Sequence, residues 1–271
     1  MHLINEQWVK QHVIHRSLIG HKKTFGHVLI IAGSEGKAGS AILCAKAALN
    51  AGCGMVTALL PNEAVSVLLE QCPEVMYINN PSIEGVDLKT FDAILIGPGI
   101  GFSETAKANL KYILDNYLGS IVLDADALTM VANEKYKLKL NHIVTPHPGE
   151  FSRLMGIEYD EDKREAQALL FIEKATAVLV LKGAKTIVGS YQNKLMQNTT
   201  GNDGMATAGS GDVLAGIIAA LCARGYANFN AAVIGVYIHG LAGDLAILNI
   251  SKSGLIASDI INSLKQIRIL D

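Results

Sequence analysis

Six short apolar runs, each ending in glycine, proline or polar residues, limit most strongly the folds open to this chain. They lie at 27–36, 54–61, 91–101, 120–128, 141–150 and 176–186. Helix-like patterns occupy much of the remaining chain, and we expect helices at 39–51, 104–117, 160–175, 211–223 and 230–248. Buried strands that alternate with helices predict an α/β fold with a mainly parallel central sheet and helices on both faces.

The segment 186–200 departs from this alternation. Its sequence, TIVGSYQNKLMQNTT, predicts a β-hairpin with turn residues at 189–193. No linker, repeat or low-complexity tract interrupts the chain, and 271 residues is a usual length for one α/β domain. We therefore expect a single domain over residues 1–271.

Composition excludes several classes of protein. Half of the residues are hydrophobic and the formal net charge is −2, which argues against disorder and against a basic nucleic-acid surface. Apolar runs such as 213–223 are shorter than the roughly 20 residues of a membrane span, and the polar N-terminus does not resemble a signal peptide. We expect a cytoplasmic protein that binds neither membranes nor nucleic acids. The cysteines, without a C-x-x-C pair, are expected to be reduced core thiols at positions Cys44, Cys53, Cys72 and Cys222.

Glycine, proline and polar residues follow the apolar runs in five places: GSEG, GPGIG, DADAL, TPHPGE and KGAKT. In open α/β sheets, ligands bind beyond the carboxyl ends of the strands. These five loops are therefore expected to share one rim of the sheet and to form the ligand site.

The stretch AGSGD, before the apolar helix 211–223, points to an anion. If Gly209, Ser210 and Gly211 lead into the helix, their free backbone amides and the helix dipole favour a phosphate there. Asp212 would repel a phosphate, but it is well placed to accept a proton from a hydroxyl that attacks the phosphorus. The alternative is that Asp212 is only the N-cap of the helix.

Three other anion or nucleophile motifs fit less well. GSEGKAGS lacks the spacing of a P-loop, and GPGIGF is one residue too short for a dinucleotide fingerprint. AGSGD does not match the G-x-S-x-G of a serine hydrolase. Phosphoryl transfer with Asp212 as base remains the favoured chemistry.

Further rim residues each carry two interpretations. His147, between two prolines, is expected on an extended loop, as a ligand or merely exposed. Asp124 and Asp126 would face the same way at a strand end and need a cation or hydrogen bonds between them; Asp126 is either a ligand or a turn residue. Glu150 either orders water around Mg²⁺, which phosphoryl transfer calls for, or caps a helix.

The last candidate site residues are the two lysines of KGAKT and one histidine. Lys182 follows a buried strand and would ordinarily be a solvated lysine. Lys185 and the intervening glycine favour contact with phosphate or ribose instead. His239, inside VYIHGLAGDLA, is interpreted as helix packing and is left out of the site.

At this point the motifs resemble a known family. GSGD, at 209–212, is similar to the G-x-G-D anion hole of the ribokinase-like superfamily, whose aspartate is the catalytic base. The set GSEGKAGSAILCAKAAL, IGPGIG, VLDADAL, TPHPGEFSRLMG, LKGAKTIV and GNDGMATAGSGDVLAG resembles the NAD(P)H-hydrate dehydratases over about residues 20 to 265. Two positions differ from that pattern: Asp203 stands where members often carry proline, and Ala208 where some carry a further glycine.

The resemblance implies a set of roles. Substrate, the hydrated dinucleotide NADHX or NADPHX, would contact Ala41, Gly101, His147 and Asp212. The nucleotide would bind Lys182, Gly183, Ala184, Lys185, Thr186 and Gly211. ADP or ATP would be the phosphate donor, the protein would be a homotetramer, and a separate epimerase would be its functional partner, since the chain is too short to include one. The alternatives are a small-molecule kinase of the same superfamily, such as one for hydroxyethylthiazole, or a non-catalytic nucleotide sensor.

Overall fold

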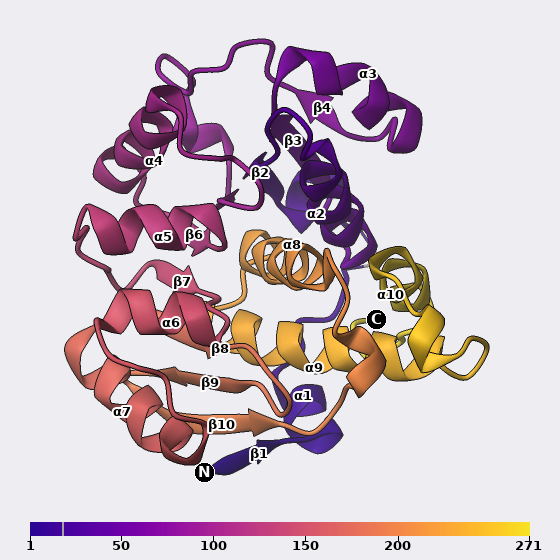
Figure 1. The fold of residues 1–271 in the computed structure, drawn as a ribbon. Helices are drawn as coiled ribbons and strands as arrows, with labels where there is room; N and C mark the ends of the chain where they lie inside the picture. The colour runs from indigo at the N-terminus through magenta and orange to yellow at the C-terminus, as the bar shows by residue number, and fades with distance from the viewer. Residues whose placement is uncertain (18) are drawn as a thin grey trace.

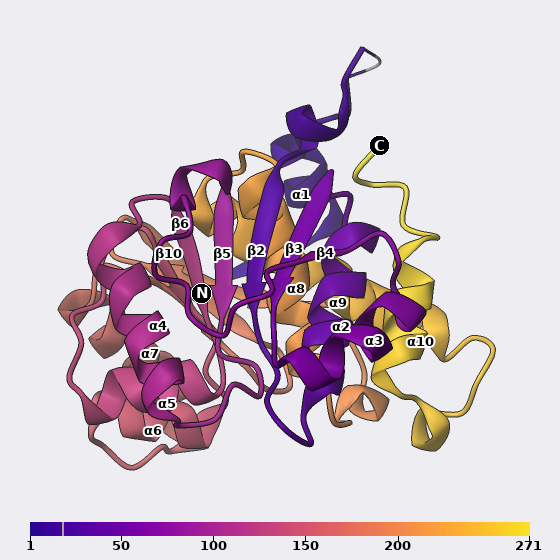
Figure 2. The ribbon, with the colours of Figure 1, turned by 90° about the horizontal axis from the view of Figure 1, so that it is seen from above.

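The computed structural model describes residues 1–17 and 19–271, which form one ten-stranded sheet with helices on both faces (Figures 1 and 2). The strand order is β1-β10-β9-β8-β7-β6-β5-β2-β3-β4. Strand β9 is antiparallel to both of its neighbours, and all other pairings are parallel. This confirms the predicted α/β fold with a mainly parallel central sheet.

The strands are β1 (His2–Ile4), β2 (His27–Ile31), β3 (Met55–Leu59), β4 (Met76–Tyr77), β5 (Ala93–Ile96), β6 (Ser120–Leu123), β7 (His142–Val144), β8 (Val178–Leu181), β9 (Ile187–Ser190) and β10 (Asn193–Asn198). The α-helices are α1 (Glu6–His12), α2 (Ala38–Asn50), α3 (Asn62–Gln71), α4 (Glu104–Asn116), α5 (Asp126–Asn133), α6 (Pro148–Met155), α7 (Arg164–Lys174), α8 (Ser210–Ala223), α9 (Asn228–Ala246) and α10 (Ala257–Leu264). Short 3-10 helices are η1 (Lys22–Phe25), η2 (Leu88–Thr90), η3 (Glu161–Lys163), η4 (Asp203–Met205) and η5 (Lys252–Gly254). All six expected strands and all five expected helices are present.

Side chains of the central strands alternate between two hydrophobic cores. On β2, Val28 and Ile30 pack with α1, α2, α3, α8, α9 and α10, whereas Leu29 and Ile31 pack with α4 to α7. Successive residues of a strand point to opposite faces, so a strand covered on both sides must be apolar at every position. This is why the strands appear in the sequence as unbroken apolar runs. Figure 2 shows the two layers of helices on either side of the sheet.

The hairpin is present, but its turn lies at 191–192 and not over the whole of 189–193. Gly189 belongs to β9, where a Cβ would lie 2.3 Å from Cδ2 of Leu195. This glycine therefore makes room for a core side chain, which its turn propensity could not reveal.

The two edge strands were not expected. Strand β1 pairs in parallel with β10, with His2 opposite Met196, and buries Ile4 completely. Strand β4 has only two residues, Met76 and Tyr77, both exposed. Segments of two or three residues are too short to show a periodic pattern, so only their pairing with neighbours identifies them.

Helix α9 is the one helix among the described residues that is long and apolar enough to cross a membrane. Most of it, 72% of the apolar window, is buried inside the protein, and buried core helices commonly pass the same test. Its apolar character is thus accounted for by packing against α8, α10 and the sheet.

The four cysteines are buried and unpaired, as predicted. Burial raises the pKa of Cys53 and of Cys72 to about 11. These two thiols are therefore protonated at neutral pH and act as small apolar side chains.

Candidate functional site

The glycine before α8 sets the geometry of the AGSGD segment. Gly209 adopts a left-handed conformation with φ of 84° and occupies the N-cap position, and the helix begins at Ser210. Asp212 is the third residue of the helix, so the interpretation of Asp212 as the N-cap is wrong. The first-turn amides of α8 have no intrahelical partners and the helix dipole is positive at this end, as expected for an anion site.

The carboxyl group of Asp212 holds its proton more tightly than an ordinary aspartate. Burial raises its pKa from 3.8 to about 6; a hydrogen bond with Ser40 opposes the rise, and the nearby charge of Asp124 adds to it. Lys182 lowers the pKa and Asp126 raises it, each by a smaller amount. At neutral pH Asp212 is therefore mainly ionised but basic enough to accept a proton, as a general base requires.

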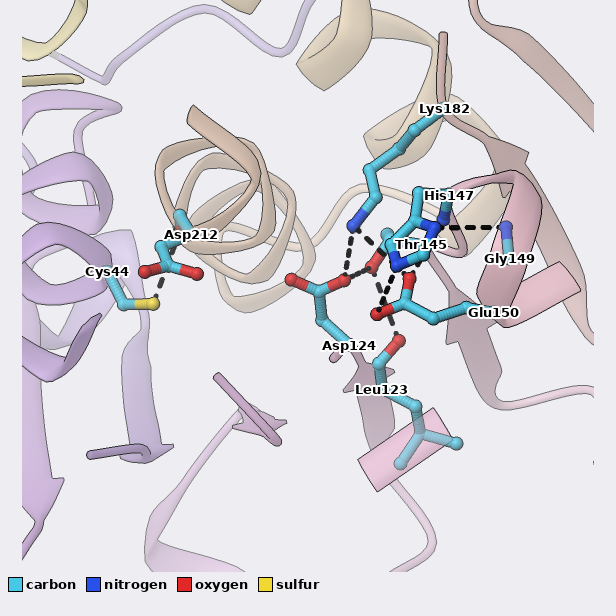
Figure 3. A network of polar contacts seen from close by, with 9 residues as sticks. All are labelled: Cys44, Leu123, Asp124, Thr145, His147, Gly149, Glu150, Lys182 and Asp212. Carbon is cyan, nitrogen blue, oxygen red and sulfur yellow. Dashed lines mark hydrogen bonds and ion pairs between the residues drawn. The ribbon is translucent and has the colours of Figure 1, made fainter. Parts of the chain in front are cut away.

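A buried ion-pair network lies opposite Asp212 (Figure 3). Nζ of Lys182 is 2.7 Å from Oδ1 of Asp124 and 3.7 Å from Oε2 of Glu150. Thr145 donates its hydroxyl hydrogen to the same Asp124 oxygen at 2.8 Å. Burial lowers the pKa of Lys182, but the two carboxylates outweigh it and leave the pKa raised. Lys182 is thus a cation held by two carboxylates, which argues against the alternative of a solvated surface lysine, while its contact with the nucleotide stays a prediction.

Lys182 also joins the KGAKT loop to the start of α8. A Cβ added to Gly211 would lie 3.4 Å from Nζ of Lys182. The ammonium group therefore stands directly beside the first turn of α8, where the anion is expected. This places a positive charge beside the Gly211 amide, with Asp212 next to it, whereas the Ser210 amide donates to the carbonyl oxygen of Thr207 at 3.3 Å.

Asp124 and Asp126 do not face the same way, contrary to the expectation for a strand end. Strand β6 ends at Leu123, and Ala125 has φ of 49°, which turns the chain before α5 starts at Asp126. Asp124 meets Lys182, whereas Asp126 accepts from the amide of Gly101 at 2.9 Å and lies 3.8 Å from Nζ of Lys37. Each carboxylate has its own partners, which relieves the predicted repulsion.

The loops after β2 and β5 are tied together. The Gly33 amide donates to the carbonyl oxygen of Pro98 at 2.8 Å, and Gly101, held by Asp126, completes this part of the rim. Ala41 is fully buried, 3.5 Å from where a Cβ on Gly33 would stand. The roles of Gly101 and Ala41 in substrate binding stay predictions.

His147 and Glu150 form the N-terminal cap of α6. The His147 amide donates to Oε2 of Glu150 at 2.8 Å, and the Gly149 amide donates to Nδ1 of His147 at 3.0 Å. Half of the His147 side chain is exposed, as predicted, while Glu150 is buried. Both Glu150 oxygens face partners, since Oε1 is 3.4 Å from Nε2 of His147. The structure therefore favours the capping interpretation of Glu150.

Residues 183–185 form an exposed loop after β8, with Lys185 at φ of 60°. Arg164, at the start of α7, holds this loop by donating to the carbonyls of Ala184 at 2.7 Å and Leu181 at 2.9 Å. Thr186 closes it with a 3.1 Å bond to the carbonyl of Gly183. Sequence reasoning missed Arg164, because nothing in its own segment points to a loop some 20 residues away.

Two side chains of α2 were also missed. Ser40 hydrogen-bonds to Asp212, and the Cys44 thiol donates to the backbone carbonyl of Asp212 at 3.3 Å. They lie four residues apart and so share one face of the helix. That spacing is the only signal in the sequence, and it does not identify the partner.

The two departures from the family pattern lie beside this site. Asp203 starts η4 and its carboxylate is 2.6 Å from Nζ of Lys252, while Ala208 is exposed just before Gly209. An ion pair between exposed side chains thus links η4 to Lys252 of η5.

Gly97 offers a direct test of how closely the rim loops pack. It has φ of 133°, and a Cβ would lie 1.8 Å from the carbonyl oxygen of Asp124. We expect Gly97→Ala to lower the free energy of unfolding by about 2–5 kcal/mol, from backbone strain plus overpacking. Gly36→Ala is the matched control, because Gly36 has φ of 75° but open space around it. If urea unfolding showed the same loss of unfolding free energy in both variants, this would contradict the close approach of Gly97 to Asp124.

The fold is that of a ribokinase-like α/β protein, and the helix start at Ser210 is its candidate anion site. The ADP/ATP-dependent NAD(P)H-hydrate dehydratase from Bacillus subtilis, co-crystallised with ATP/Mg²⁺, has a similar structure: the TM-score is 0.89 and the identity 28%, over 98% of this chain and 96% of that one. The sequence model of the NAD(P)H-hydrate dehydratase family matches residues 28–266. The chain belongs to this family.

Two curated relatives show how the chain compares in length. The ADP-dependent (S)-NAD(P)H-hydrate dehydratase of Neisseria meningitidis serogroup B is 35% identical over 92% of this chain and 86% of the relative. The bifunctional NAD(P)H-hydrate repair enzyme of Moorella thermoacetica is 37% identical over 97% of this chain but only 53% of the relative. The chain thus spans about half the length of the bifunctional relatives that it matches.

Proposed function

We propose that the protein is a carbon–oxygen lyase that dehydrates the S form of hydrated NADH and NADPH at the expense of ADP or ATP. One observation carries the proposal: the carboxyl group of Asp212 stands in the first turn of α8, and the ammonium group of Lys182 lies beside Gly211 in the same turn. Phosphoryl transfer needs this combination of a base for the attacking hydroxyl and positive charge for the phosphate. Family membership supplies the substrate class.

In the first step, the hydroxyl group on the nicotinamide ring of the hydrate attacks the terminal phosphorus of the nucleotide. Asp212 takes the hydroxyl proton, a new oxygen–phosphorus bond forms, and the bond to the leaving nucleotide breaks, giving AMP from ADP or ADP from ATP. The amides of Gly209 and Gly211 and the ammonium of Lys182 stabilise the charge on the transferred group, while the Ser210 amide is engaged by the carbonyl oxygen of Thr207.

In the second step, the phosphorylated oxygen leaves. The lone pair of the neighbouring ring nitrogen expels inorganic phosphate, which is a far better leaving group than hydroxide. Loss of a proton from the adjacent carbon then restores the dihydropyridine. No net oxidation or reduction occurs, so the product is the reduced cofactor itself.

We propose that the nucleotide enters as its magnesium complex. In the described part of the chain, no three acidic, histidine or cysteine side chains gather as metal ligands. Asp124 and Glu150 are already engaged by Lys182, Thr145 and His147. A protein-ligated metal therefore does not fit these residues, whereas a magnesium ion held by nucleotide phosphates and water does.

The first experiment follows absorbance in the reduced-nicotinamide band while protein, magnesium and hydrated NADH are mixed with ADP or with ATP. A rise with one nucleotide supports the dehydratase and identifies its phosphate donor. A stable phosphorylated product without that rise would favour a small-molecule kinase. Tight nucleotide binding with no substrate-dependent turnover of any kind would favour a nucleotide sensor.

The pH dependence of the rate is a second expected result. Because Asp212 must be ionised to accept the proton and its pKa is about 6, we expect kcat/KM to fall tenfold per pH unit below about pH 6. The measurement is kcat/KM for the hydrate from pH 5 to 8. A flat profile over that range, with the protein still folded at pH 5, would argue against Asp212 as the base.

We further propose that the enzyme works in the cytoplasm as a homotetramer, together with an epimerase that converts the other form of the hydrate into its substrate. Bifunctional relatives, described as repair enzymes, support the link to a second activity. Sedimentation of the purified protein would test the oligomeric state.

A further inference from the structure

One face of α9 contacts the site, although the proposed function assigns it no part. The segment HGLAGD contains two adjacent pairs, His239–Gly240 and Gly243–Asp244. Members of one pair lie three to five residues from members of the other, so the four share one side of the helix. In Figure 1, α9 runs beneath α8 and the loop that leads into it. We call these four residues the α9 platform.

The first contact of the platform is with the anion hole. Nε2 of His239 lies 3.3 Å from Oγ of Ser210, the first residue of α8, and the Ser210 side chain is buried. Burial lowers the pKa of His239 to about 4. A hydrogen bond with the Ser210 backbone opposes this change, and the charge of Lys182 lowers the pKa further. A neutral imidazole therefore contacts the residue between the two glycines of the anion hole.

The second contact is with the loop at 199–209. The carboxylate of Asp244 accepts from the Gly201 amide at 2.8 Å and from the Asn202 side chain at 3.0 Å. Thr200 donates its hydroxyl hydrogen to the carbonyl of Tyr237 at 2.8 Å, two residues before the platform starts at His239. The loop is thus held along α9 just before it reaches Gly209.

The two glycines of the platform allow this close approach. A Cβ on Gly240 would lie 2.3 Å from Oγ1 of Thr200 and 2.7 Å from its carbonyl carbon. A Cβ on Gly243 would lie 2.2 Å from Sδ of Met205. Glycine inside a helix is unfavourable by roughly 0.8–1 kcal/mol relative to alanine, so these residues serve the contact and not the helix.

We propose that the α9 platform positions the anion hole: His239 orients the first turn of α8 through Ser210, and Asp244 fixes the loop that enters it. The inference rests on the proposed function for its chemistry, but not for its geometry. Gly209 and Gly211 are intrinsically mobile, so amides that converge on a phosphate need an external support. Neither His239 nor Asp244 touches substrate; both are positioning residues.

The main test removes the hydrogen bond of His239 and roughly keeps the volume of its side chain. We expect His239→Leu to lower kcat by between about twofold and tenfold, the effect of one neutral hydrogen bond, with KM for the nucleotide changed less. His239→Gln places an amide group near the position of Nε2, and we expect it to retain most of kcat. His142→Leu is the matched control: His142 is also buried with its pKa lowered to about 4, but it begins β7, at the end of the strand away from the site.

A double variant separates positioning from general packing. If His239 acts through Ser210, His239→Leu has little further effect on kcat in a Ser210→Ala background. Full additivity of the two changes, or equal losses of kcat in His239→Leu and His142→Leu, would overturn the proposal.

Amide hydrogen exchange tests the role of the α9 platform without measuring the reaction. In His239→Leu we expect faster exchange of the Ser210 and Val213 amides, which donate to the carbonyls of Thr207 and Gly209, and in Asp244→Ala faster exchange at 201–205, both in the nucleotide-free protein. Unchanged exchange in both segments would also overturn the inference. If wild-type protein shows no dehydratase activity, the proposed function fails, while these exchange rates still decide the platform.

Discussion

Asp212→Asn is expected to lower the turnover number by about 10² to 10⁴-fold, because the variant lacks the base that accepts the hydroxyl proton. Nucleotide affinity should change much less, since the amides of α8 and Lys182 remain in place. The measurement is kcat with hydrated NADH and the preferred nucleotide, together with calorimetric titration of the nucleotide alone. Near-normal turnover would remove Asp212 from the mechanism.

The same substitution is expected to stabilise the protein. Because the folded-state pKa of Asp212, about 6, lies above its ordinary value of 3.8, ionising this group favours unfolding. Its contribution to stability is present below about pH 4 and is lost as the pH rises through about 6. At pH 7 we expect the variant to exceed wild type by ~2 kcal/mol in free energy of unfolding, and the difference to shrink by pH 5. Gain of stability with loss of turnover distinguishes a base from a structural residue.

Lys182→Met is expected to have the largest combined effect. Asp124 and Glu150 are both buried, so removing their shared cation leaves two uncompensated carboxylates and lowers the free energy of unfolding by about 3–5 kcal/mol. Loss of the charge beside Gly211 should also weaken nucleotide binding at least tenfold. Urea unfolding and calorimetric titration with ADP or ATP measure the two effects separately.

A second substitution tests the cause of that instability. Adding Asp124→Asn to Lys182→Met removes one orphaned charge while keeping an oxygen for Thr145, and should recover much of the lost stability without restoring nucleotide affinity. Lys185→Met, in the exposed part of the same loop, is the control and should leave unfolding nearly unchanged. If Lys182→Met had the same free energy of unfolding as wild type, the burial of Asp124 and Glu150 would not depend on this lysine.

The fold could be predicted in outline because its central strands are buried on both faces. Strand β5 is apolar at every position and β2 at every position after His27, and the glycine-rich or polar loops after them mark their ends. The edge strands β1 and β4 lack this signature, because one side of each meets solvent and each is only two or three residues long. Pairing with a neighbour, not local pattern, creates them.

The candidate site could be predicted only where neighbouring residues form one motif. GSGD places an aspartate and glycine amides within four residues, and the structure puts them at the N-cap and in the first turn of α8. The surroundings of Lys182 could not be predicted, because its partners Asp124, after β6, and Glu150, in α6, come from distant segments. Arg164, Ser40, Cys44 and His239 were missed for the same reason.

The sequence by itself determined the α/β class, the sharing of one rim by five loops, and the position of Asp212 and its glycines at a helix start. All of these depend on residues close together in the chain, through strand periodicity, loop composition and the free amides at a helix start. Only the tertiary structure decided how readily the side chains of the candidate site ionise and which residues contact them. The pKa of Asp212, the pairing of Lys182 and the support of Ser210 by His239 arise from burial and from contacts between distant segments. Charges and hydrogen bonds across such contacts depend on distances that the order of residues does not contain.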